Sequence, residues 1–120
     1  MLRHNNLIAW QRADDLFIRL HRLASERFPP VERFELGSQI RRAGHSVAAN
    51  IVEGVARRSP AQQLHFLNIS EASLAEVAYC LHVARRLNNV TQTEYAELDA
   101  EVQRVFAPLT GLIRRTKETG

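Results

Sequence analysis

The chain has 120 residues, of which 45% are hydrophobic and 24% charged, and it carries a formal net charge of +3. These values are typical of one globular domain that folds around an apolar core without disulfides or metals, and they exclude a disordered chain. The sequence has neither the apolar run of a signal peptide at its start nor a stretch long enough to cross a bilayer. We therefore expect a soluble, cytoplasmic protein with no membrane partner.

The positive charge is uneven along the chain. Residues 1–58 carry ten arginines against six acidic residues, and fifteen of the sixteen basic residues are arginine. Guanidinium groups bind phosphate bidentately and stack on bases, so nucleic acid is one candidate partner. An arginine-favouring genome with ordinary salt bridges explains the same composition. Composition alone favours this second explanation, because a net charge of +3 is a weak field.

The first predicted helix covers residues 7–27. Apolar side chains recur there at spacings of three and four from Leu7 to Ala24, which is the pattern of an amphipathic helix. Asn5 and Asn6 are candidate N-caps. The Phe28-Pro29-Pro30 segment ends the helix, because residues before a proline avoid helical angles.

The second predicted helix covers residues 32–55 and has two distinct faces. One face is apolar and carries Leu36, Ile40, Ala43, Val47 and Ile51. Another face, which we call the polar seam, consists of Glu32, Gln39, Arg42, Ser46, Asn50 and Glu53. Its short or neutral members are unlike the lysine and glutamate mixture of a freely solvated helix face.

Two further helices are predicted over residues 60–87 and 92–116. Ser59 and Thr91 begin capping-box patterns before them. The lone Cys80 lies between apolar neighbours, which favours a buried structural thiol over a reactive one. Pro108 is expected to kink the fourth helix or end its regular part, and residues 114–120 are expected to fray.

Helices of this length joined by short turns predict an all-α fold, an up-down-up-down antiparallel four-helix bundle in a single domain over residues 1–120.

The sequence offers no constellation for catalysis or metal binding. The chain has five histidines, and none has an acidic residue three positions earlier, the spacing that di-metal bundles use. It also lacks a phosphate-binding glycine loop, a nucleophile elbow and the HExxH motif. We expect no enzymatic activity, no catalytic residues, no metal and no cofactor.

The polar seam has two interpretations. It forms a recognition surface, in which neighbouring arginines contact phosphates, or a hydrogen-bond and ion-pair network between helices or subunits. The small residues around it favour the network, and the two roles can coexist. On this view Arg41, Arg57 and Arg58 remain at the rim and are the candidate nucleic-acid-binding residues.

The second helix and its flanks resemble a known family. The pattern FP-x2-E-x3-L-x2-Q-x-RRA-x2-S-x3-NI-x-EG-x2-R is matched from Phe28 to Arg57, and the later small-S-L-x-E pattern is matched from Ala72 to Glu76. These are hallmarks of the four helix bundle protein family, also called the 23S rRNA intervening-sequence protein family. Alanine replaces the family's glycine before Ser73, and Pro108 is atypical.

The resemblance implies a homopentamer and brings no catalytic residues. It also implies a relationship to the accessory variability protein of diversity-generating retroelements, which associates with nucleic acid and a reverse transcriptase. We therefore expect a non-enzymatic oligomeric scaffold that binds RNA or DNA through arginines of the second helix and the following turn. The alternative is a protein–protein adaptor without a nucleic-acid role, in which the polar seam serves only subunit assembly.

Overall fold

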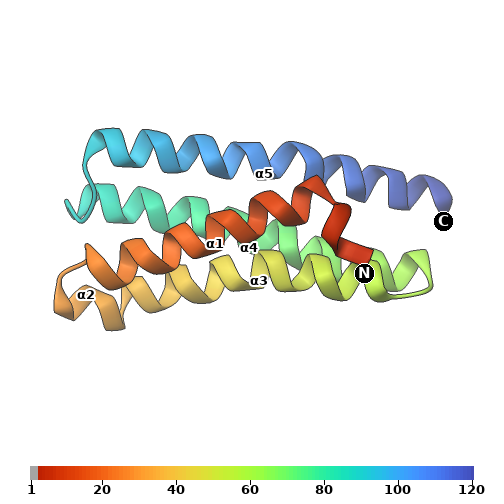
Figure 1. Cartoon of the computed structure of the whole chain (residues 1–120), viewed down its shortest axis with the longest axis horizontal. Helices are drawn as coiled ribbons and strands as arrows, with labels where there is room; N and C mark the ends of the chain where they lie inside the picture. Colours follow the sequence, from red (N-terminus) through yellow and green to blue (C-terminus); the bar gives the residue numbers. More distant parts are fainter. Residues whose placement is uncertain (1–2) are drawn as a thin grey trace.

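The computed structural model describes residues 3–120 and shows an elongated bundle of four long helices, 45 × 23 × 22 Å in extent (Figure 1). The elements are a 3₁₀ helix η1 (Arg3–Asn6), α1 (Ile8–Glu26), α2 (Pro30–Phe34), α3 (Leu36–Ala56), α4 (Pro60–Arg86) and α5 (Gln92–Thr119). The four long helices alternate in direction along the chain, so the predicted all-α up-down-up-down four-helix bundle is confirmed.

The core runs along the bundle axis and consists of the apolar faces that the helical spacing predicts. Leu20 of α1 and Ile40 of α3 are fully buried, as is Leu74 of α4. Phe28 is 1% exposed in the turn after α1. Cys80 of α4 is 2% exposed, and its burial raises the pKa of the thiol, so the prediction of a buried structural cysteine is confirmed.

A break at Glu35 divides the second predicted helix, which was expected to run unbroken over residues 32–55. Glu35 has φ −105° and ψ −90°, outside the helical region, so α2 ends before it and α3 begins after it. The segments meet closely at Gly37, where an added Cβ would lie 3.0 Å from the carbonyl oxygen of Glu32 and 3.3 Å from the Cβ of Ala24 in α1. The prediction of one unbroken helix is therefore wrong, and the Gly37-Ser38 pair directly after the break is a local kink signal that the helical spacing did not take into account.

The ends of α1, α4 and α5 follow local capping rules with one exception, and the starts of α2 and α3 have no side-chain cap. At α4, the Ser59 hydroxyl accepts a hydrogen bond from the Gln62 N–H at 3.1 Å. At the end of the same helix, Asn88 takes the left-handed conformation with φ 61°, which asparagine tolerates well. The exception is α1, whose N-cap is Leu7 without a side-chain cap, so the prediction of an asparagine cap at Asn5 or Asn6 is wrong.

The capping box predicted for α5 is complete. The Thr91 hydroxyl accepts from the Glu94 N–H at 3.0 Å, and the Glu94 carboxylate accepts from the Thr91 N–H at 2.8 Å. Both orphan donors at this helix start are therefore satisfied.

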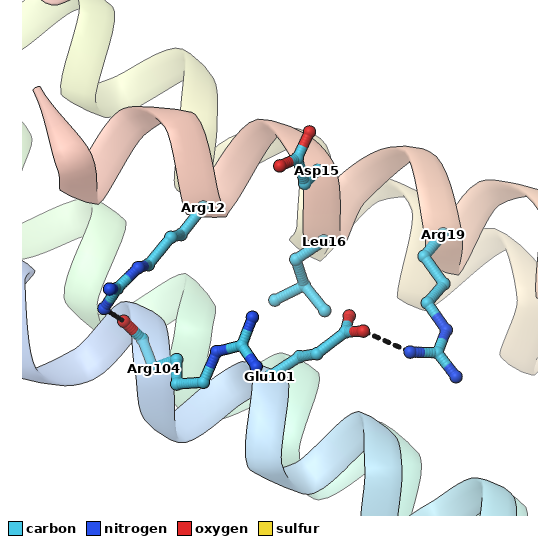
Figure 2. A pocket seen from close by; sticks show the side chains of 6 residues that line it. All are labelled: Arg12, Asp15, Leu16, Arg19, Glu101 and Arg104. Atoms are coloured by element: carbon cyan, nitrogen blue, oxygen red, sulfur yellow. Dashed lines mark hydrogen bonds and ion pairs between the residues drawn. The ribbon is translucent and has the colours of Figure 1, made fainter. Parts of the chain in front are cut away.

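The sequence predicts that Pro108 kinks α5 or ends its regular part. The helix continues through Pro108 to Thr119, so the second alternative is wrong, as is the prediction that residues 114–120 fray. Proline has no N–H, and the carbonyl of the residue four positions earlier, Arg104, loses its helical donor. The guanidinium of Arg12 replaces that donor: its Nη1 lies 2.9 Å from the Arg104 carbonyl oxygen (Figure 2). A side chain of α1 thus compensates for the proline in α5.

Ion pairs connect α1 and α5 beside this contact. Arg19 pairs with Glu101 and, at 3.1 Å, with Glu97, while Arg27 pairs with Glu94 at 3.2 Å. The cavity drawn in Figure 2 has a volume of about 180 Å³ and lies between these two helices. Because Arg12, Arg19 and Glu101 in its wall already contact partners, we interpret it as part of the α1–α5 packing.

Candidate functional site

The polar seam contacts α4 of the same chain near its middle. The hydroxyls of Ser46 in α3 and Ser73 in α4 share a hydrogen bond of 2.7 Å. The Asn50 side chain donates to the Ser46 carbonyl at 2.9 Å and to the Ser46 hydroxyl at 3.0 Å. Ser73 is 9% exposed, so this cluster satisfies polar groups that are nearly removed from water.

Two ion pairs flank the serine cluster. Arg42 of α3 pairs with Glu76 of α4 at 3.1 Å, and Glu53 of α3 pairs at 2.9 Å with Arg57, which directly follows that helix. The side chains of Arg42 and Glu53 are 71% and 53% exposed, so solvent screens both pairs. Part of the seam is therefore an intrachain α3–α4 network, and part of it still faces outward.

The remaining seam residues, Glu32 and Gln39, lie at the α2 end of the bundle. Asn89, after α4, has its Nδ2 3.4 Å from the Glu32 carboxylate, which connects α2 to the α4–α5 turn. Gln39 is exposed and lines a groove of about 300 Å³ with Tyr79 and Leu87 of α4. An assembly role for the six seam residues stays a prediction.

Four large apolar side chains are exposed in α2 and in or just after α4; Tyr79 and Leu87 line the groove, whereas Val31 and Phe34 do not. Phe34 is 83% exposed, Tyr79 67%, Val31 66% and Leu87 55%. Sequence analysis missed these four residues, which we call the apolar patch. In the sequence, these four residues lie off the apolar faces of the helices, and that position could have identified them as exposed. A patch of this kind on a soluble protein marks a protein contact surface more often than a free surface.

The structure brings together only two of the three candidate nucleic-acid-binding residues. Arg57 and Arg58 are neighbours in the α3–α4 turn, and both are exposed. Arg41 lies sixteen residues earlier, roughly 24 Å along the helix axis. It is half-buried, and its Nη2 donates to the carbonyl oxygen of Arg33 at 2.9 Å, which connects α2 to α3.

The α3–α4 turn lies at the same end of the bundle as both ends of the described chain (Figure 1). Arg3 donates to the Val55 carbonyl at 3.1 Å, and Gly120 approaches Pro60. We call this region the basic end. Its cations are Arg3, Arg57, Arg58, Arg114, Arg115 and Lys117, and its carboxylates are Glu53, Glu118 and Asp14, which lines a cavity together with Glu53.

A cavity of about 380 Å³ opens at the basic end and is lined by Arg57, Ala61, Gln62, His65 and Phe66. The Arg57 guanidinium lies over the Phe66 ring, 4.7 Å from its centroid. Phe66 lies off the main apolar face of α4, which predicts a second contact surface there, but the sequence alone did not identify this stack.

Within residues 3–120, no group of three or more histidine, cysteine and acidic side chains could hold a metal ion. None of the helices in the same range combines the length and apolarity needed to cross a membrane.

Comparison with known proteins finds one matching family model and several matching solved structures. The family model described as 23S rRNA-intervening sequence protein matches residues 5–111. A crystal structure from Bacteroides thetaiotaomicron, described as a protein with unknown function from the S23 ribosomal protein family, superposes with a TM-score of 0.83. It is 23% identical, and the match covers 89% of this chain and 96% of that one, so it supports the fold. A search of curated proteins finds no significant match.

Proposed function

Because the chain belongs to the 23S rRNA-intervening sequence protein family, we propose that it is a non-enzymatic, homo-oligomeric scaffold that binds RNA or DNA through its basic end. One observation carries this proposal: the adjacent Arg57 and Arg58 are exposed in the α3–α4 turn, at the end of the bundle where six cations outnumber three carboxylates. Phosphate is the partner that such a surface attracts most strongly.

Most cations at the basic end have no carboxylate partner within residues 3–120 and are therefore available to a ligand. Arg57 pairs with Glu53, but Arg58, Arg114 and Arg115 form no ion pair with any residue in the described range 3–120. Elsewhere Arg19, Arg27 and Arg42 are paired with glutamates. Within residues 3–120, five of the six cations at the basic end form no ion pair, while Arg41 contributes to the α2–α3 connection.

Binding of labelled structured RNA and duplex DNA, measured by fluorescence anisotropy at two salt concentrations, tests the nucleic-acid part. We expect affinity to fall steeply with salt, and the double variant Arg57→Ala/Arg58→Ala to weaken binding and flatten the salt dependence by about two phosphate contacts. Arg22→Ala is the matched control, because Arg22 is an exposed arginine of α1. Absence of binding at low ionic strength, or equal loss in the control, contradicts the proposal.

Self-assembly is the other part of the proposal, and the apolar patch supports it. The family resemblance suggests a pentamer. Light scattering should then give a mass near five chains, and Phe34→Ser should lower it, because Phe34 is the most exposed large apolar residue. A monomeric mass for the unaltered protein contradicts this part.

The same patch supports a second candidate, a protein–protein adaptor without a nucleic-acid role. In that case the oligomer persists, nucleic acid does not bind, and Asn50→Ala or Glu53→Ala disrupts the assembly. Reversing the charge of exposed arginines then changes nothing.

A further inference from the structure

The stacked pair Arg57 and Phe66 presents a flat cationic surface at the basic end. Two contacts orient the Arg57 guanidinium: it lies 4.7 Å from the Phe66 ring centroid, and its Nη2 lies 2.9 Å from the Glu53 carboxylate. One face of the guanidinium is therefore occupied by the phenyl ring. The Arg57 side chain is still 43% exposed, so part of it remains accessible to a ligand.

The cavity beside this pair has a composition that suits a nucleobase. Its volume of about 380 Å³ is at the lower end of the range for small-ligand sites, enough for one planar group. Gln62 adds an amide that can both donate and accept, as a base edge requires, and His65 adds a second planar ring. Arginine planes and aromatic rings are the groups on which unpaired bases stack.

The charges around the cavity fit the rest of a nucleotide. Arg58 follows Arg57 directly, is exposed, and forms no ion pair within residues 3–120. A base in the cavity would place its phosphate within reach of this free guanidinium. A base in a duplex has both faces covered by its neighbours, so a stacking site of this kind discriminates in favour of single strands.

We propose that the cavity formed by Arg57, Gln62, His65 and Phe66 binds one unpaired base of a single-stranded nucleic acid, stacked on the Arg57 guanidinium, with Arg58 pairing to the adjacent phosphate. The proposal rests on the proposed function, because it specifies the form of nucleic acid that the basic end recognises.

The test compares three labelled probes of one sequence: a 12-nucleotide single-stranded RNA, the corresponding single-stranded DNA, and the DNA duplex. Binding is measured by anisotropy with the full chain. We expect both single strands to bind more tightly than the duplex, and Phe66→Leu to weaken single-strand binding about 5- to 100-fold while leaving duplex binding unchanged. Phe106→Leu is the matched control, because Phe106 is a half-buried phenylalanine of α5 that does not line the cavity. Thermal melts of both variants verify folding.

Each other outcome decides against the base site. If single strands and duplex bind equally, and Arg58→Ala weakens both while Phe66→Leu weakens neither, the basic end binds phosphate only and the proposed function still stands. If no probe binds at low salt, both proposals fail. If Phe66→Leu changes the mass of the oligomer and not the affinity, the cavity is a subunit contact.

Discussion

Arg12 donates a hydrogen bond to the carbonyl oxygen of Arg104 at 2.9 Å, across the interface between α1 and α5. The donor that a regular helix would supply to this carbonyl is the N–H of residue 108, and residue 108 is proline. The contact explains how α5 extends to Thr119 despite Pro108. It also predicts that the two positions are energetically coupled.

Arg12→Ala should therefore destabilise the protein by about 0.5–1.5 kcal/mol, because the Arg104 carbonyl loses its donor. The loss is modest because the site is exposed, and water partly takes the place of the guanidinium as donor. In a Pro108→Ala background, the new N–H satisfies the same carbonyl, and Arg12→Ala should cost much less. Urea unfolding of the four proteins in this double-mutant cycle measures the coupling. Additive effects of the two substitutions would contradict the compensation.

The Ser46–Ser73 hydrogen bond should contribute measurably to α3–α4 packing. Ser46→Ala leaves the Ser73 hydroxyl, 9% exposed, without its partner, and we expect a loss of about 1–2 kcal/mol. Replacing both serines by alanine should cost less than the sum of the single changes, since no hydroxyl is then stranded. The exposed Ser25→Ala in α1 is the control for altered helix propensity. A loss no larger than that of Ser25→Ala would show that the bond contributes nothing.

Gly54 is expected to be intolerant of a side chain. An added Cβ would lie 3.2 Å from the Gln63 carbonyl oxygen and 3.2 Å from the Leu67 Cγ, so Gly54→Ala should lower the thermal midpoint by pushing α3 away from α4. Gly111→Ala in α5 is the matched control. The Cβ there meets the flexible Arg115 side chain at 3.3 Å, and the substitution should raise stability by about 0.5–1 kcal/mol through helix propensity. Thermal melts that rank the two variants in the opposite order would refute the close approach.

Stability should fall in acid partly through Glu94. The hydrogen bond from the Thr91 N–H and the nearby Arg27 guanidinium lower the pKa of this carboxyl from its ordinary 4.5. A carboxyl with a lowered folded-state pKa stabilises the fold fully above its unfolded-state pKa, and that contribution disappears as the pH falls through the folded-state value. Glu94→Gln should therefore flatten the pH dependence of the urea midpoint below about 4.5, whereas the exposed Glu118→Gln should not. Parallel acid profiles for Glu94→Gln and the unaltered protein would exclude this role.

The helices could be predicted from sequence because their signals are local. Ser59 and Thr91 start α4 and α5 within three residues of the groups they cap, and the apolar spacing identified the faces that carry Leu20 and Ile40. The continuation of α5 through Pro108 was not predictable from local signals. It depends on Arg12, which lies 92 residues from its acceptor in the chain.

The candidate site also has some features that the local sequence predicts and others that depend on the folded structure. The sequence identified Arg57 and Arg58 as candidate phosphate contacts, and it showed that they are adjacent because they are consecutive residues. Their separation from Arg41 follows from helix geometry, and the Arg57–Phe66 stack depends on how the α3–α4 turn folds back. The exposure of Phe34 accompanies the break at Glu35, which the apolar spacing of the second predicted helix did not reveal.

The segments on the two sides of the break at Glu35, α2 and α3, should differ in local stability. None of the residues in the range Pro30–Phe34 is buried, and α2 connects to its surroundings through contacts such as the one between Arg41 and the Arg33 carbonyl. Segments with few buried apolar groups open with a smaller free energy than the core. Amide hydrogens of α2 should therefore exchange with solvent long before those of α3, and brief chymotrypsin treatment should cleave first after Phe34. The bundle would then behave as a rigid body with one short segment that detaches while the core stays folded.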